Sequence, residues 1–517
     1  MTSDALEQAI TFIEDRDYAA AEPLLLKLHE ADPSNARVNY ALGLVAMAAN
    51  EFAMALGFLE MAARVATQQP FVFTALSETL LKVGDTANAV ETARRAVSMA
   101  PSSASAQQAL GEAYLADGRP VMARAALTEA LKQAPDNAAI LTRLSQAERA
   151  LGEKEAADLR LKAALETGPN EPETLLEAVG QGLFTDTGSA RAALEKAMES
   201  AALPGETRFR LSMAAGHLAE REEDPEAAFA HYGKYRALAY PPYEKKRRSW
   251  QIDAYRQTFT REYFMERFSV ATQNARPVFI LGLPSSGAAL LEDLLTRHRK
   301  LTAGGEVPYF DLVGRQLRVD PHITPTYFQG ALRLPEKEFK RIGRGYQKVL
   351  DGIDQKAAHI VHRMVTDYEH LWLLALLFPR ATFIHIRRDP LDTCAGLYRT
   401  VLPAHHNYNA SEESLVHHVR TYRDLMAFWQ EVLPIEMTTV NYEDLIADPD
   451  GETRRIWAAM GIEGGPDPKM DDPVSIVARH RAELEPASGQ AAEWGRKHFQ
   501  PFADGLKTAA GPAKVLH

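Results

Sequence analysis

The feature that most constrains the fold is a repeat of 34 residues in the first third of the chain. Leucines stand at this interval, each followed by a small residue: Leu42, Leu76, Leu110 and Leu144, with Gly43, Ser77, Gly111 and Ser145. Two sets of alanines keep the same interval: Ala55, Ala89, Ala123 and Ala157, and Ala62, Ala96, Ala130 and Ala164. Prolines close successive units at Pro101, Pro135 and Pro169. A period of this length is typical of helix pairs that stack on copies of themselves.

The residue types explain how such units pack. Small side chains let the two helices of a unit cross closely, leucines fill the layer between units, and proline ends the second helix. On these residues the segment resembles the tetratricopeptide repeat family. The resemblance implies an all-α solenoid over residues 1–170 that recruits a protein or peptide partner. The alternative is an irregular alanine-rich bundle.

Residues 171–275 carry helical patterns without clear repeat marks, so we expect further helical repeats and a linker there. Tyr240-Pro241-Pro242-Tyr243 interrupts the pattern, and Asn274–Pro277 marks a boundary. The basic run Lys245–Arg248 favours a solvated helix face.

From residue 276 to residue 517 the pattern changes to alternating strands and helices. The predicted strands are Pro277–Leu283, His359–His362, Thr382–Arg387 and Met437–Asn441, and helices such as Glu369–Phe378 and Glu413–Val432 lie between them. This alternation predicts an α/β domain with a parallel sheet covered on both faces. Ligands on such sheets bind at the carboxyl ends of the strands. We therefore expect the Pro284–Gly287 turn, Arg363 and Arg387–Pro390 to converge on one rim.

The first of these strands leads into a phosphate-type turn. Gly282 and Gly287 are spaced as in a nucleotide P-loop, and the backbone N–H groups of Ser286–Ala289 open an apolar helix. Such groups hold an anion without side-chain help. The usual Lys-Ser/Thr pair is replaced by Ala288-Ala289, so no side chain there can hold Mg²⁺. The turn predicts an anion site that works without a metal.

Composition narrows the class of protein further. The net charge of −11 disfavours sequence-independent binding to nucleic acid. The single cysteine, Cys394, excludes an intrachain disulfide and a cysteine-based zinc cluster. Met1–Asp15 lacks the pattern of a signal peptide, and the apolar stretch Leu371–Phe378 is too short to cross a membrane. We expect a soluble, cytoplasmic protein.

Four blocks in order resemble the sulfotransferase family. They are Gly282–Leu291, Ala303–Glu306, Phe378–Asp392 and Tyr442–Leu445. The resemblance is to the bacterial branch that places tetratricopeptide repeats before the transferase domain and is similar to tyrosylprotein sulfotransferases. It implies a P-loop-like domain that transfers a sulfuryl group from 3′-phosphoadenosine-5′-phosphosulfate (PAPS) to an acceptor hydroxyl without a metal.

The resemblance also assigns roles to single residues. Glu306 aligns with the general base, and the alternative is a glutamate that caps a helix or turn. Arg363 stands where the family carries a lysine that stabilises the leaving oxygen, and a salt bridge at the rim is the alternative. Arg388 aligns with the arginine that binds the 3′-phosphate. The alternative is that it pairs with Asp389 or Asp392. The remaining implied cofactor contacts are Ser285, Ser286, Gly287, Ala288, Ala289 and Arg496.

The chain departs from the family at several of these positions. The usual loop Pro-Arg-Ser-Gly-Thr-Thr reads Pro284-Ser-Ser-Gly-Ala-Ala, and Gly396 stands where the family has a serine for the 3′-phosphate. Each lost contact weakens binding by about 1–3 kcal/mol. The sequence therefore also admits a catalytically inactive, sulfotransferase-like scaffold that acts through its repeats.

Overall fold

The computed structural model describes residues 2–49, 51–184, 186–200, 203–307, 309–317, 326–365, 367–403, 406–484 and 489–507. The chain divides into two compact units, Met1–Ala214 and Ala215–His517, and helix α13 (Gly205–Arg221) contains the point of division. The boundaries expected near residues 170 and 275 stay predictions.

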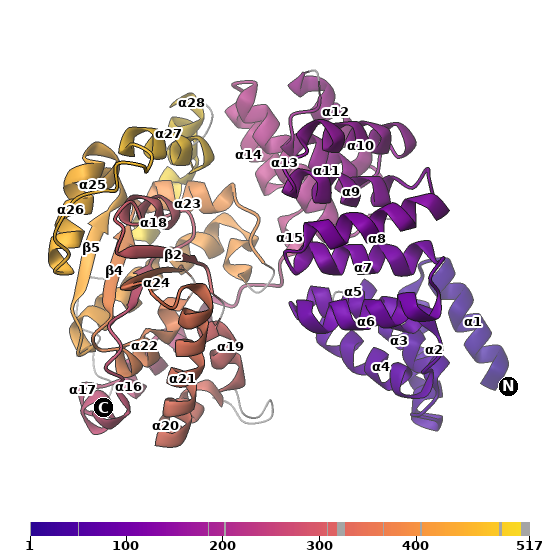
Figure 1. Cartoon of the computed structure of the whole chain (residues 1–517), viewed down its shortest axis with the longest axis horizontal. Helices are drawn as coiled ribbons and strands as arrows, with labels where there is room; N and C mark the ends of the chain where they lie inside the picture. Colours follow the sequence, from indigo (N-terminus) through magenta and orange to yellow (C-terminus); the bar gives the residue numbers. More distant parts are fainter. Residues whose placement is uncertain are drawn as a thin grey trace. The chain divides into compact units, whose positions relative to one another are not determined.

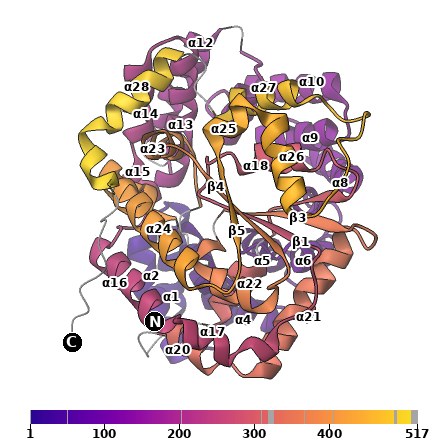
Figure 2. The same ribbon diagram turned by 90° about the vertical axis from the view of Figure 1, so that its left-hand side faces the viewer.

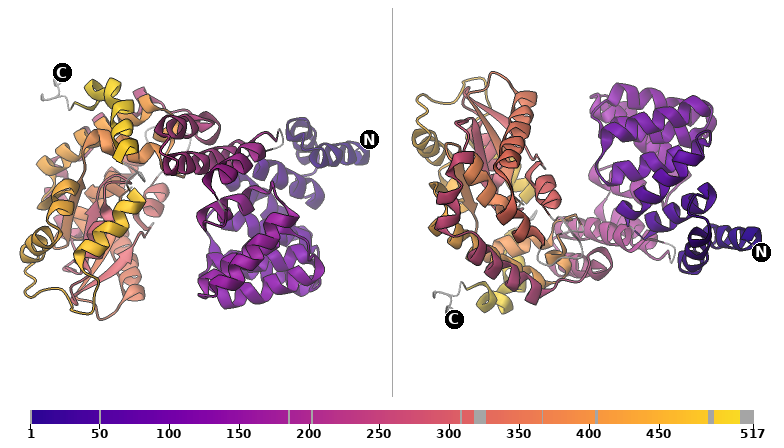
Figure 3. Two further views of the ribbon diagram at one scale, coloured as in Figure 1. Left: turned by 90° about the horizontal axis from the view of Figure 1, so that it is seen from above. Right: turned by 90° about the horizontal axis from the view of Figure 1, so that it is seen from below.

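The first unit is a stack of antiparallel helix pairs (Figures 1 and 3). Its helices are α1 (Thr2–Glu14), α2 (Tyr18–Ala31), α3 (Ala36–Ala48), α4 (Phe52–Val65), α5 (Pro70–Lys82), α6 (Thr86–Met99), α7 (Ala104–Ala116), α8 (Pro120–Gln133), α9 (Ala138–Ala150), α10 (Lys154–Thr167), α11 (Pro172–Gly180) and α12 (Thr187–Met198). This architecture confirms the predicted helical solenoid.

The small residues of the repeat lie where the paired helices cross. The repeated alanines Ala55, Ala89, Ala123 and Ala157 are fully buried. A Cβ at Gly43 would lie 2.6 Å from Cγ of Leu59, so a larger side chain would force the pair apart. At residue 77, where the unit has serine instead, the hydroxyl donates to the carbonyl oxygen of Ala89 at 2.9 Å. Burial of a hydroxyl is tolerated there because the hydroxyl is hydrogen-bonded.

The second unit is built on a five-stranded parallel sheet with the order β2-β3-β1-β4-β5. The strands are β1 (Pro277–Leu281), β2 (Leu301–Gly305), β3 (His359–Met364), β4 (Thr382–Arg387) and β5 (Met437–Asn441). Four of them were predicted, and β2 was not. Its sequence, Leu-Thr-Ala-Gly-Gly, lacks a strand pattern, but a Cβ at Gly304 would lie 2.8 Å from Cε1 of His362, so the glycine lets the edge strand approach β3.

Helices cover both faces of this sheet, as predicted (Figure 2). One face packs against α18 (Ala288–Leu295), α25 (Tyr442–Ala447), α26 (Pro449–Ala459) and α27 (Pro473–Leu484) through a buried apolar cluster. The other face packs against α21 (Glu336–Ile353), α22 (Leu371–Leu377) and α24 (Glu412–Val432).

The other helices of this unit are α14 (Pro225–Gly233), α15 (Arg236–Ala239), α16 (Lys245–Thr258), α17 (Arg261–Glu266), α19 (Tyr309–Gln316), α20 (Thr326–Arg333), α23 (Pro390–Tyr398) and α28 (Gly489–Phe499), with 3-10 helices η1 (Phe268–Val270), η2 (Asp367–His370), η3 (Asn407–Ala410) and η4 (Gln500–Leu506). The basic run opens α16, but it is not wholly solvated, because Arg248 is buried in an ion pair with Glu369. No helix within the described residues has the length and apolar character needed to span a membrane.

Candidate functional site

The turn that follows β1 is held in a conformation that only small residues permit. Gly287 has a φ of +93°, and a Cβ there would clash with the Tyr442 ring. A Cβ at Gly282 would lie 2.6 Å from Oγ of Ser286. Ser285 adopts a φ of +65°, which is unusual for a residue with a side chain. Strained backbone of this kind persists where the surroundings hold it, often at a ligand site.

The N-terminus of α18 faces this turn without a cap. Among the described residues, no side chain accepts a hydrogen bond from its first N–H groups. The hydroxyl of Ser286 is buried and has no partner among the described residues. Unpaired N–H donors at a helix N-terminus bind anions. The turn therefore has the donors that an anion requires.

Arg388 lies against the same turn. Its Nη1 donates to the carbonyl oxygen of Ser285 at 3.2 Å, and its guanidinium lies 4.5 Å from the centre of the Tyr442 ring. Its Nε is buried and has no hydrogen-bond partner in the described ranges of the chain. Neither Asp389 nor Asp392 pairs with it in the part of the chain that is described. The fold thus brings a guanidinium with free donor capacity to the uncapped helix N-terminus.

Gly396 faces this corner as well. A Cβ at this position would lie 3.0 Å from Cβ of Ser285 and 4.0 Å from Nη1 of Arg388. One helical turn later, Oγ1 of Thr400 lies 3.3 Å from Oγ of Ser285 and donates to the Gly396 carbonyl at 2.8 Å. A hydroxyl is therefore present at the corner although residue 396 has no side chain. Sequence reasoning missed Thr400 because no motif marks it.

Arg363 and Glu306 form a second cluster with a residue that the sequence did not single out. Nε of Arg363 lies 2.8 Å from Oε2 of Glu292, and Nη1 lies 3.5 Å from Oε1 of Glu306. Glu292 is buried on α18, and its Oε1 accepts a hydrogen bond from the N–H of Gly305 at 2.8 Å. Burial raises the pKa of Glu292, although the Gly305 hydrogen bond and Arg363 oppose the shift. Glu292 thus links the backbone before Glu306 to Arg363.

The guanidinium of Arg496, a residue of α28, lies beside the start of α23. Its Nη1 lies 3.1 Å from Oδ1 of Asp389 and 2.7 Å from Oδ2 of Asp392. Asp389 also caps the helix, accepting from the N–H groups of Leu391 and Asp392. Arg496 therefore neutralises the acids that follow Arg388.

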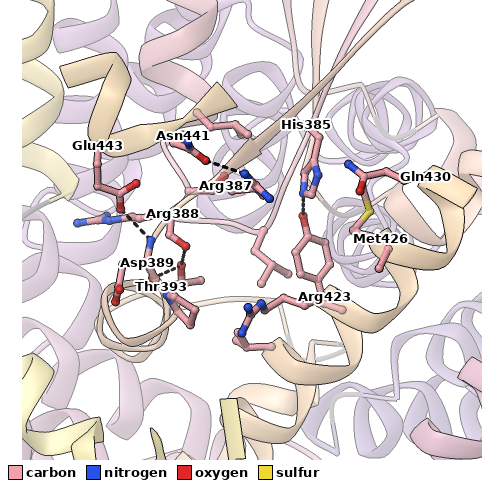
Figure 4. A pocket seen from close by; sticks show the side chains of 17 residues that line it. His385, Arg387, Arg388, Asp389, Thr393, Arg423, Met426, Gln430, Asn441 and Glu443 are labelled. Atoms are coloured by element: carbon pink, nitrogen blue, oxygen red, sulfur yellow. Dashed lines mark hydrogen bonds between the residues drawn. The ribbon is translucent and has the colours of Figure 1, made fainter. Parts of the chain in front are cut away.

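A cavity of about 360 Å³ opens beside Arg388, on the α24 face of β4 (Figure 4). Its polar lining includes three arginines, Arg387, Arg388 and Arg423, together with Ser286 from the turn. Its apolar walls come from Leu283, Ile386, Val419, Met426 and Ala427. His385 and Tyr422 also line it, and Nε2 of His385 lies 2.8 Å from the Tyr422 hydroxyl. Of this lining, sequence reasoning named Ser286 and the segment Arg387–Pro390, but not the α24 residues or His385.

Within the described residues, no group of three or more histidine, cysteine, aspartate or glutamate side chains is placed to hold a metal ion.

Comparison with known proteins assigns a class to each unit. Residues 277–466 match the model of the sulfotransferase family. Residues 6–70, 74–121 and 115–176 match tetratricopeptide repeat models. The chain therefore contains tetratricopeptide repeats followed by a sulfotransferase-family domain.

Individual relatives are distant. An uncharacterized protein of Aquifex aeolicus (strain VF5) is 23% identical over 294 residues, which is 55% of this chain and 39% of that protein. Omega-hydroxy-beta-dihydromenaquinone-9 sulfotransferase Stf3 of Mycobacterium bovis (strain ATCC BAA-935 / AF2122/97) is 33% identical over 98 residues, 17% of this chain and 25% of the enzyme. The chain thus matches well under half the length of these relatives.

Solved structures resemble parts of the chain only loosely. The thermophilic tetratricopeptide repeat protein TTC0263 of Thermus thermophilus is 18% identical, with a TM-score of 0.32, over 36% of this chain and all of that one. The MamA protein is 20% identical, with a TM-score of 0.29, over 33% of this chain and 92% of its own.

Proposed function

We propose that this protein transfers a sulfuryl group from PAPS to an acceptor hydroxyl, and that its repeats recruit the acceptor or a partner protein. The observation that carries the proposal is the corner where Arg388 lies against the uncapped N-terminus of α18. A planar guanidinium beside fixed N–H dipoles suits a phosphate group. The matched family supplies the class of reaction.

The residues present fit a phosphate-bearing co-substrate. Ser286 Oγ and Arg388 Nε are buried polar atoms without a partner in the described chain, and both belong to the corner. In this proposal the Ser285–Ala289 turn and Arg388 hold the phosphates, and the bound PAPS supplies the sulfuryl group. Arg496 acts indirectly in this proposal. It pairs with Asp389 and Asp392, so these carboxylates do not compete with the phosphate for Arg388.

Glu306 is the proposed general base. It takes the proton of the acceptor hydroxyl as the acceptor oxygen bonds to sulfur and the bond from sulfur to the phosphate oxygen breaks. The electron pair of that bond stays on the departing phosphate, where the N–H groups of the turn and the guanidinium of Arg388 stabilise its charge. Arg363 lies beside Glu306, so it orients the carboxylate and adds positive charge near the transferred group.

Calorimetric titration with adenosine 3′,5′-bisphosphate (PAP), the product left after transfer, tests the proposal. We expect saturable binding with a micromolar dissociation constant, and adenosine alone as a control should bind far more weakly. Absence of binding by both PAP and PAPS would overturn the proposal.

A second candidate is a catalytically inactive scaffold that acts through its repeats. Two observations favour it: the turn lacks the usual arginine and the two usual threonine hydroxyls, and Arg363 is already engaged by Glu292 and Glu306. A silent titration would support this scaffold. For either candidate we propose a cytoplasmic location, which suits a chain with one buried cysteine.

A further inference from the structure

We propose that Glu292 is a positioning residue for the transfer step, whose one buried carboxylate fixes both the backbone that leads into Glu306 and the guanidinium of Arg363 beside it. The inference rests on the proposed function, in which Glu306 takes the proton of the acceptor hydroxyl. Glu292 does not contact the reacting atoms and acts only through these two neighbours.

The backbone just before Glu306 leaves the regular pairing of the sheet. The register of β2 against β3 shifts between Ala303 and Gly305, and Gly305 has a φ of +65°. The N–H of Gly305 donates to Oε1 of Glu292 at 2.8 Å. A backbone N–H that is withdrawn from water needs such an acceptor. Because this acceptor belongs to α18, a helix helps to set the path of the chain into Glu306.

Arg363 stands between two carboxylates that differ in exposure. Its Nε lies 2.8 Å from Oε2 of Glu292, and its Nη1 lies 3.5 Å from Oε1 of Glu306. The side chain of Glu292 is 6% exposed, whereas that of Glu306 is 59% exposed. An exposed ion pair orients its members only weakly, because water screens it and both side chains lose freedom in forming it. With Nε beside the buried carboxylate, the planar guanidinium presents Nη1 to Glu306 in a fixed direction.

Glu292 also keeps Arg363 from pairing tightly with the proposed base. Without the buried carboxylate, the guanidinium could turn its planar pair of donors fully to Glu306. A carboxylate in a tight ion pair with arginine is a weaker proton acceptor. The shorter distance from Arg363 to Glu292 therefore leaves Glu306 available to an acceptor hydroxyl.

The place of Glu292 in the chain connects the base to the phosphate corner. Glu292 stands on α18, one helical turn after Ala288, where the uncapped N-terminus of this helix begins. The helix proposed to hold the phosphates thus also sets where Glu306 stands relative to them. Proton transfer requires the base within hydrogen-bond reach of the hydroxyl, so a small displacement of this segment would slow the reaction.

Packing alone is a poor reason for a carboxylate at this position. Burial raises the pKa of Glu292, although the Gly305 hydrogen bond and the charge of Arg363 oppose the shift. The ionised form is therefore held at a cost, and apolar residues of similar size often stabilise a fold as well as a buried ion pair does. A carboxylate that orders two groups of the site accounts for that cost.

Hydrogen exchange tests the effect on the backbone and needs neither co-substrate nor acceptor. For Glu292→Ala we expect the amide of Gly305, followed by mass spectrometry of peptides that cover residues 303–307, to exchange about 3- to 10-fold faster. Glu292→Gln keeps an oxygen that accepts from this N–H, so its exchange should stay close to that of the unaltered chain.

Glu148 provides the matched control. It is as buried as Glu292, at 5% exposed, and its Oε1 lies 3.4 Å from Nε of Arg160, but it lies on α9 in the first unit. Glu148→Ala should leave the exchange of residues 303–307 unchanged, and Glu148→Gln should leave the rate of transfer unchanged.

Kinetics tests the effect on transfer. The rate is measured as the formation of PAP from PAPS with 4-nitrophenol as acceptor, or with water where the phenol is not accepted. For Glu292→Gln we expect kcat to fall about 10- to 100-fold, as for a small displacement of a reacting group, with KM for PAPS and the affinity for PAP unchanged. In a Glu306→Gln background the same substitution should cause no further loss, because a residue that acts through Glu306 has nothing left to position.

The outcomes distinguish the inference from the proposed function. Unchanged exchange in Glu292→Ala, or a loss of kcat that is as large in the Glu306→Gln background as in the unaltered chain, would overturn the inference and leave the proposed function intact. Glu292→Asp gives the same kinetic test if Glu292→Gln fails to fold, because it keeps the charge but is one methylene too short to hold both partners. Failure of the unaltered protein to bind PAP and PAPS would instead overturn the proposed function, and with it the role of Glu292 in transfer.

Discussion

The guanidinium of Arg388 donates to the carbonyl oxygen of Ser285, 103 residues earlier in the chain, at 3.2 Å. This contact joins the end of β4 to the turn after β1, which are neighbouring strands of the sheet. It holds a cation beside the uncapped N-terminus of α18, in the absence of the arginine that the related loops carry at position 285.

Replacing Arg388 tests this corner. We expect Arg388→Ala to weaken PAP binding by about 10- to 100-fold, because hydrogen bonds to charged groups contribute about 1.5–3 kcal/mol. Arg388→Lys keeps the charge but loses the planar pair of donors, so its loss should be smaller. Calorimetry provides the measurement, and Arg455→Ala is the control, since Arg455 is an exposed arginine paired with Glu452 on α26. Equal affinities for Arg388→Ala and Arg455→Ala would contradict the assignment.

Restoring the family's serine at position 396 is not expected to raise PAP affinity by itself. A Cβ at this position would lie 3.0 Å from Cβ of Ser285, so Gly396→Ser alone should not strengthen PAP binding. Ser285→Gly removes that neighbour and relieves the positive φ. The double variant should therefore bind PAP about 3- to 10-fold more tightly than Gly396→Ser alone, as expected for one added hydrogen bond. Ser285→Gly alone is the reference, and a tighter complex in the Gly396→Ser single variant would refute the crowding argument.

A substitution at Glu306 distinguishes an effect on the rate of transfer from an effect on PAP binding. Glu306→Gln preserves the shape of the side chain beside Arg363 but cannot accept a proton. We expect the rate of sulfuryl transfer to fall by about 10²- to 10⁴-fold, the usual contribution of a general base. PAP affinity, measured by calorimetry, should stay the same. The rate of transfer is measured as the formation of PAP from PAPS, with a phenol or sugar acceptor that supports turnover. A Glu306→Gln variant that retains full activity would exclude Glu306 as the base.

Glu412 gives the second unit a pH-dependent stability. Hydrogen bonds, chiefly from His498 and also from the Tyr398 hydroxyl, lower its pKa to about 2 against burial that opposes the shift. Because the folded pKa lies below the unfolded value, this contribution is present above about pH 4.3 and is lost as the pH falls towards 2. We expect Glu412→Gln to reduce the free energy of unfolding by about 1–2 kcal/mol at pH 6, discounted because the side chain is partly exposed.

Tryptophan fluorescence in urea measures this effect in the right unit. All five tryptophans, Trp250, Trp372, Trp429, Trp457 and Trp494, lie in Ala215–His517. The difference between Glu412→Gln and the unaltered chain should shrink between pH 6 and pH 3. A difference that stays constant over this range would show that Glu412 contributes by packing and not by its charge.

Local patterns in the sequence were enough to predict the helical repeats and four of the five strands. The 34-residue period and four strands were read from nearby residues, because hydrophobic periodicity and turn residues act over short separations. The apolar helix predicted to follow the turn is α18. The glycine-rich strand β2 was not predicted. It forms because Gly304 packs closely against His362, a residue far along the chain.

The sequence by itself determined that the chain joins helical repeats to a parallel α/β domain, and that a glycine-bounded turn leads from its first strand into a helix. Only the tertiary structure decided which side chains meet there: Glu292 with Arg363, Thr400 with Ser285, Arg496 with Asp389 and Asp392, and His385 with Tyr422. The reason is physical. Strand and helix formation depend on patterns within a few residues, whereas these contacts join side chains 37 to 115 residues apart, and their partners follow from sheet order and helix packing.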